Sequence, residues 1–192
     1  KTTLALGFPS PYVADIDGNL DGPLRVVQKR NPALAYAYDR IGFLEDGSSV
    51  PLPQQWPRLL KCVAEAAKDD SVRTIIIDGL THVDNILQYF VCAQQMKSEM
   101  DIALWRPFRR ELMNAIMTWR STGKNLVMLC HEENIYRTDP KNMMKLDLER
   151  RVPAISSRIS DVFGGLFTDM WRCQAYPGVG GRPPGWRPLF RP

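Results

Sequence analysis

Short apolar runs alternate with amphipathic segments along this chain, and the alternation predicts an α/β fold. Three runs, at residues 12–16, 74–78 and 125–130, are almost wholly apolar and lead directly into polar residues. Runs of this kind are typical of strands that are buried on both faces of a parallel sheet. We therefore expect a mainly parallel sheet that is flanked by helices.

Between these runs, apolar residues recur at the spacing of amphipathic helices. Leu59, Val63 and Ala66 mark one such helix over residues 58–70. The other expected elements are helices over 83–96 and 108–121, short helices over 3–8 and 155–163, a strand near 170–174, short strands within 26–30 and 33–44, and a loop or mobile excursion over 134–152. Pro, Gly and Arg dominate from residue 176, which predicts a disordered tail over 176–192 after one domain over 1–175.

Composition narrows the class of protein. The 192 residues are 44% hydrophobic and 24% charged, with a net charge of +4, which is ordinary for a globular domain. No apolar run approaches the roughly 18 residues of a transmembrane helix, so no membrane association is expected. The four cysteines show no metal-binding or disulfide spacing, and this favours reduced thiols in a cytoplasmic protein.

The carboxyl ends of the expected strands are the first places to look for a site, because ligands of parallel α/β sheets bind there. Asp78 ends a buried run, where a carboxylate is costly unless it is paired or binds a cation. It could cap the helix that follows. In P-loop NTPases, however, a carboxylate at this place holds Mg²⁺, and we favour that role.

Two further candidates follow the other strands. Asp17 could act as a general base that orients a water molecule, or it could belong to the turn Asp17-Gly18-Asn19. Asp15 is a second candidate for the same task. His131 follows the third run and could donate to a phosphate, whereas His82 is expected to serve local packing.

The first three residues suggest which ligand is bound. Lys1, Thr2 and Thr3 match the end of the phosphate-binding loop G-x-x-x-x-G-K-[ST], whose Lys contacts the β- and γ-phosphates and whose Ser or Thr binds Mg²⁺. The glycines that precede the Lys in that loop are not in this sequence. We therefore expect the chain to begin within such a loop, directly after its glycine-rich part.

The order of KTT, VADIDGNLD, TIIIDGLT and LVMLCHEEN resembles the RecA-like ATPase core, specifically the phage-encoded AAA-type recombination ATPases with single-strand annealing activity. The resemblance implies a RecA-like P-loop NTPase core without its first strand and glycine loop. It also implies Mg²⁺-dependent ATP hydrolysis, a homo-oligomeric ring or filament, and a location in the cytoplasm of a bacterial host. A neighbouring subunit would supply an arginine to the site, for which Arg158 and Arg172 are both candidates.

The resemblance assigns roles to the strand-end residues. The nucleotide-binding residues would be Lys1, Thr2, Thr3 and Asp78. Thr2 and Asp78 would hold the Mg²⁺, Asp17 would be the catalytic acid, and His131 would be the sensor that couples the nucleotide state to DNA binding. Gly79 stands where Ser or Thr is common in the family, and Asp17 is shorter than the usual Glu.

In RecA-like proteins the loop after the sensor strand contacts single-stranded DNA. The basic residues of that segment here are Arg137, Lys141, Lys145, Arg150 and Arg151. Phosphate neutralisation by these residues, with Tyr136 as a stacking surface, would hold a single strand without sequence preference. Residues 105–110, in which aromatic residues and arginines alternate, are a second candidate surface.

The leading hypothesis is therefore an ATPase of phage-type recombination that acts on single-stranded DNA. One alternative keeps the fold and makes the protein a hexameric helicase or a DNA-packaging motor, which strand displacement would reveal. The other is a nucleotide-binding scaffold that binds ATP without turnover.

Overall fold

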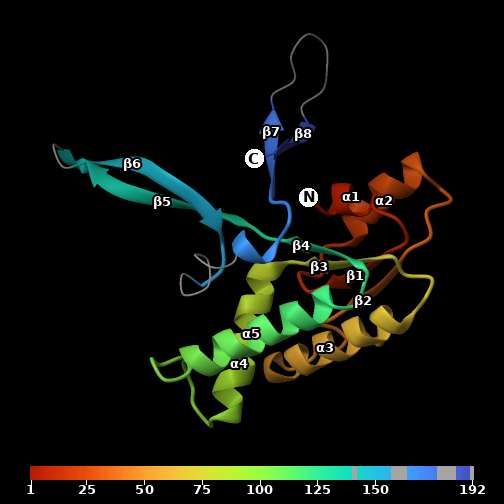
Figure 1. The fold of residues 1–192 in the computed structure, drawn as a ribbon, viewed down its shortest axis with the longest axis horizontal. Coiled ribbons are helices and arrows are strands. Elements are labelled where there is room, and N and C mark those ends of the chain that lie inside the picture. The colour runs from red at the N-terminus through yellow and green to blue at the C-terminus, as the bar shows by residue number, and fades with distance from the viewer. Residues whose placement is uncertain (140–141, 157–163, 177–184, 191–192) are drawn as a thin grey trace.

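The computed structural model describes residues 1–139, 142–156, 164–176 and 185–190 (Figure 1). The elements in chain order are α1 (Thr2–Ala5), β1 (Pro11–Asp15), α2 (Asp21–Arg30), β2 (Ala37–Arg40), α3 (Leu52–Lys68), β3 (Thr74–Asp78), α4 (Leu80–Gln94), α5 (Trp105–Arg120), β4 (Asn125–Leu129), β5 (Glu132–Asp139), β6 (Asn142–Pro153), the 3₁₀ turn η1 (Gly164–Leu166), β7 (Trp171–Tyr176) and β8 (Gly185–Phe190).

Four strands form a parallel sheet in the order β2-β1-β3-β4. The three predicted buried runs are β1, β3 and β4, so the α/β prediction with a parallel sheet is confirmed. Because all four strands run in the same direction, their carboxyl ends meet at one edge of the sheet. The register pairs Asp15 with Asp78 and Ile77 with Met128 at that edge.

Each face of the sheet is covered by its own layer of helices (Figure 1). Alternate strand residues point to opposite faces. Tyr12, Ala14, Ile75 and Ile77 pack with the buried residues of α3, α4 and α5, whereas Val13 and Ile76 pack with Leu6, Leu20 and Leu24 of the α1–α2 side. The result is a three-layer α/β/α domain.

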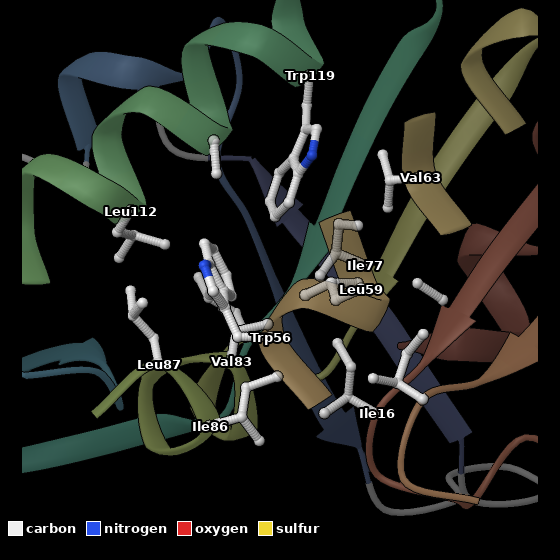
Figure 2. Packing of buried hydrophobic residues seen from close by; sticks show 14 of the residues in the cluster. Ile16, Trp56, Leu59, Val63, Ile77, Val83, Ile86, Leu87, Leu112 and Trp119 are labelled. Carbon is white, nitrogen blue, oxygen red and sulfur yellow. The ribbon is translucent and has the colours of Figure 1, made fainter. Parts of the chain in front are cut away.

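The larger core cluster is built around two tryptophans (Figure 2). The rings of Trp56 and Trp119 lie 6.2 Å apart between their centroids, and Trp56 is fully buried. Its indole Nε1 donates to Oε1 of Glu111 at 3.2 Å, so the one polar atom of the ring is satisfied. This packing fixes α3 and α5 against the sheet.

One of the two short strands predicted on the N-terminal half of the chain is wrong. Residues 26–30, expected as a strand, belong to helix α2, in which Leu24 is buried and Val27 packs against the smaller cluster. Asp21 in the first turn and basic residues in the last turn of α2 complement the helix dipole. The second strand of that region, β2, does form within the predicted span 33–44.

Helix α3 begins six positions earlier than the predicted start at residue 58, with Leu52 as its first residue. Pro53 lies in the first turn, where a missing N–H costs nothing. Pro57 does lie inside the helix, where it forfeits one backbone hydrogen bond. The burial of Trp56 offsets that loss.

The segment expected as a loop over 134–152 instead contributes to an antiparallel hairpin of β5 and β6. Residues 145–149 alternate basic or acidic with apolar side chains, which is the period-2 signal that the prediction overlooked. A second antiparallel pair joins β7, predicted near 170–174, to β8, which lies within the predicted tail over 176–192. The expected helix over 155–163 falls largely on residues 157–163, which lie outside the described residues.

Candidate nucleotide-binding site

Three carboxylates gather where β1 and β3 end. Asp15 and Asp78 are register partners at the last position of their strands, and Asp17 follows two residues after β1. The backbone N–H of Ile16 donates to the carbonyl oxygen of Asp78 at 2.6 Å and extends the ladder by one step. The predicted site residues on these two strands therefore share one edge of the sheet.

Thr2 reaches this edge from α1. Its hydroxyl donates to Oδ2 of Asp78 at 2.7 Å, across 76 positions of sequence. Burial raises the pKa of Asp78, the carboxylates of Asp17 and Asp15 raise it further, and the Thr2 hydrogen bond opposes the rise. The Thr2 hydroxyl and the Asp78 carboxylate are therefore a suitable pair of oxygen ligands for Mg²⁺. The ion completes its octahedral coordination with water and phosphate oxygens.

The ammonium of Lys1 donates to the carbonyl oxygen of Cys130, directly after β4. Lys1 therefore lies beside the strand end that leads to His131, and both residues line a cavity of about 600 Å³ along β4. Thr3 is half-buried on α1 and is not part of the Thr2–Asp78 pair.

Asp17 lies between two imidazoles. Its Oδ1 is 2.6 Å from Nδ1 of His82, and its Oδ2 is 3.7 Å from Nε2 of His131. The Asp17 side chain is 12% exposed, whereas the two histidine side chains are 49% and 60% exposed. The predicted catalytic pair Asp17 and His131 is thus brought together, and His82 joins it.

Gly79 provides the space for the Asp17 carboxylate. A Cβ atom at Gly79 would lie 2.2 Å from Oδ1 of Asp17 and 2.6 Å from its Cγ. Any larger residue would displace the carboxylate. This close approach explains why glycine stands at a position where the resembled family often has Ser or Thr.

The sequence matches the protein family described as AAA domain over residues 1–180. The match covers nearly the whole chain. The chain belongs to the AAA domain family. No curated protein and no solved structure matches the sequence.

Members of this family are nucleotide-binding ATPases, and the parallel sheet with its strand-end carboxylates is consistent with their P-loop type of core. Within the described part of this AAA domain, no three His, Cys, Asp or Glu side chains are arranged to hold a metal ion by themselves. Nor is any helix there long and apolar enough to cross a bilayer.

The predicted DNA-binding residues of the AAA domain lie on the β5–β6 hairpin. Arg137 belongs to β5, and Lys145, Arg150 and Arg151 belong to β6. Lys141 lies outside the described residues, as does the candidate trans-acting Arg158. The hairpin extends away from the sheet and its helices (Figure 1).

In the second DNA candidate, residues 105–110 at the start of α5, the aromatic residues and the arginines differ in burial. Phe108 is fully buried, and Trp105 packs edge-on against it at 5.4 Å between ring centroids. Arg106, Arg109 and Arg110 of the same helix are exposed. The aromatic residues of this segment therefore belong to the core, and only its arginines are available to a partner.

Two features of the site were not predicted from the sequence, the contact of His82 with Asp17 and the burial of Asp15. His82 was assigned to local packing, yet its Nδ1 lies 2.6 Å from Oδ1 of Asp17. Asp15 is only 1% exposed. Its Oδ1 accepts hydrogen bonds from the backbone N–H groups of Gly18 and Asn19. Its Oδ2 has no hydrogen-bond partner among the described residues. Burial raises the pKa of Asp15, so its position beside Asp78 adds to the cost of negative charge at this edge.

Proposed function

We propose that this AAA domain is a Mg²⁺-dependent ATPase that acts on single-stranded DNA in phage-type recombination. The observation that supports the proposal best is the hydrogen bond of 2.7 Å from Thr2 to Asp78. These residues come from two distant segments, and they are the two that a P-loop NTPase needs side by side for its metal ion.

Each residue has a separate task in this proposal. Lys1 would neutralise the β- and γ-phosphates, while Thr2 and Asp78 would hold Mg²⁺, which supplies charge neutralisation at the phosphates when it is bound. Asp17 would accept a proton from the attacking water and orient it. His131 would donate to the γ-phosphate and report its loss to β5, which begins at the next residue.

The proposed DNA contact is the β5–β6 hairpin. Phosphate contacts from Arg137, Lys145, Arg150 and Arg151 would bind a single strand without reading its sequence. Because β5 follows His131 directly, the DNA surface and the nucleotide site are connected through one residue. Assembly into a ring or filament would place an arginine of a neighbour, such as Arg172 on β7, at the phosphates.

The test is ATP hydrolysis by the natural polypeptide that carries this sequence, with and without single-stranded DNA and with and without Mg²⁺. We expect turnover that DNA stimulates, and a loss of at least about 100-fold in Lys1→Ala and Asp78→Asn, because charge stabilisation is the main contribution to phosphoryl transfer. Lys61→Ala, an exposed residue of α3, is the control and should match the wild type.

The outcomes separate the alternatives. Hydrolysis that is unchanged in Asp78→Asn would overturn the site assignment. ATP binding without phosphate release would instead support a nucleotide-binding scaffold. Strand displacement coupled to turnover would support a helicase or packaging motor rather than an annealing protein.

A further inference from the structure

Asp17 is a short side chain that must hold one orientation to act on a water molecule. Gly79 contacts one side of its carboxylate without any side chain of its own. No described residue makes an aligned hydrogen bond to the buried Oδ1. Nδ1 of His82 lies 2.6 Å from that oxygen.

We propose that His82 is a positioning residue, which holds the Asp17 carboxylate from the first turn of α4 and so fixes the water-activating oxygen; this inference rests on the ATPase proposed above. Nδ1 of His82 contacts one oxygen of the Asp17 carboxylate, and the backbone of Gly79 packs closely against the same group. Without His82, the carboxylate would lose this contact.

The two histidines do not share one task. His131 lies 3.7 Å from Asp17, which is beyond hydrogen-bond distance, so its Nε2 remains available to a phosphate. His82 is closer by more than an ångström. The nearer imidazole therefore positions the carboxylate, and the more distant one is free to meet the nucleotide.

The first turn of α4 also holds the other side of the site. Oγ1 of Thr81, the residue before His82, accepts the backbone N–H of His131 at 3.3 Å and lies 3.5 Å from Sγ of Cys130. Neighbouring residues of one helical turn thus contact both proposed catalytic groups. A displacement of this turn would move Asp17 and His131 together.

Steady-state ATP hydrolysis tests the inference through a pair of substitutions. His82→Leu removes the ring nitrogen, and we expect kcat to fall about 10- to 100-fold, the usual effect of removing a supporting partner, with KM changed by less than about twofold. His82→Asn restores an amide donor near the place of Nδ1 and should recover most of the loss. Asn85→Ala, which is exposed one turn further along α4, is the matched control.

A His82→Leu variant with wild-type kcat would overturn the inference and leave the ATPase intact. A rise in KM at unchanged kcat would overturn it as well, because a positioning role acts on the chemical step. Thermal unfolding of both variants should agree with the wild type within about 2 °C, since the side chain is half exposed.

The NMR signals of the imidazole nitrogens test the contact between His82 and Asp17 without requiring ATP hydrolysis. The chain has two histidines, so His131→Gln leaves the signals of His82 alone. Asp17→Asn in that background should shift the Nδ1 signal of His82, whereas Asp39→Asn should not. An unmoved signal would overturn the inference; a shifted signal in a protein that hydrolyses no ATP would overturn the proposed function, and the catalytic part of the inference with it.

Discussion

The α/β/α body and the β5–β6 hairpin are held together in different ways. In the body, strands β1 and β3 are covered by helices on both faces, and a residue such as Trp56 or Ile76 has no exposed surface. The strands of the hairpin pair mainly with each other and extend away from the body (Figure 1). The body therefore sets stability and the geometry of the nucleotide site, whereas the hairpin can carry a binding function that stability does not constrain.

The base of the hairpin is the exception, because it is tied to the site. The N–H of Ala154 donates to the carbonyl oxygen of His131 at 2.8 Å, which closes the hairpin. The N–H of Ser156 donates to Oδ1 of Asp84 on α4 at 3.3 Å. Movement of β4 or α4 at the nucleotide site would thus be transmitted to the hairpin through its two ends.

The largest expected difference between the two regions concerns aromatic residues. Trp56→Ala should lower the free energy of unfolding by about 3–5 kcal/mol, because it opens a cavity in the core. Tyr136→Ala, at an exposed side chain of β5, should change it by less than about 0.5 kcal/mol. Urea unfolding measures both. Equal losses would show that the hairpin is part of the cooperative core.

A second prediction concerns Gly79, at the edge of the sheet where β1 and β3 end. Gly79→Ala should displace Asp17 and lower the rate of ATP hydrolysis about 100-fold, which is the contribution of a positioned general base. Its melting temperature should change little, because the atom in the way is a side-chain carboxylate. Gly22→Ala in α2, where an added Cβ meets nothing within 4 Å, is the control. Full activity in Gly79→Ala would remove Asp17 from the mechanism.

Sequence alone predicted the parts of the site that depend on topology. Asp17, Asp78 and His131 follow separate apolar runs, and parallel pairing necessarily brings such strand ends to one edge. The pairing of His82 with Asp17 could not be predicted, because it depends on the angle at which α4 leaves β3.

The burial of the strands was predicted less well than their parallel pairing. The apolar run of β4 indicates a strand covered on all sides, yet β4 is the edge strand of the described sheet, and residues 126–129 are only half-buried beside the cavity of about 600 Å³. An apolar run shows that a strand can be buried. It does not show whether another strand or helix covers the free edge of that strand. The hairpin was missed for a different reason, because the period-2 alternation over residues 145–149 was overlooked.

The third prediction tests the binding function of the hairpin. Arg150→Glu combined with Arg151→Glu on β6 should weaken single-stranded DNA binding about tenfold or more and reduce the salt dependence of the affinity, because phosphate contacts are lost. Lys29→Glu with Arg30→Glu, at the exposed end of α2, changes the net charge equally and is the control. Fluorescence anisotropy at several salt concentrations measures both. An equal loss in the two variants would indicate a general charge effect and no hairpin site.

The smallest effect is expected at Asp15, where the body tolerates a buried charge. Burial raises the pKa of Asp15 above its ordinary value of 3.8. At pH values between the pKa of the unfolded chain and the raised pKa of the folded protein, the folded protein holds a proton that the unfolded chain has released. Stability therefore falls as the pH rises through this window, and the penalty persists at neutral pH. Asp15→Asn keeps an oxygen for the N–H groups of Gly18 and Asn19 and removes the charge.

In the absence of nucleotide and Mg²⁺, this substitution should raise the melting temperature at pH 7 by about 2–4 °C, the shift that about 1 kcal/mol produces in a domain of this size, and the gain should shrink toward pH 4. Asp46→Asn is the opposite case, because hydrogen bonds from Ser48 lower the pKa of Asp46, so its loss should give no gain at pH 7. A gain in Asp15→Asn that is independent of pH would mean that packing, and not the buried charge, limits stability at this edge of the sheet.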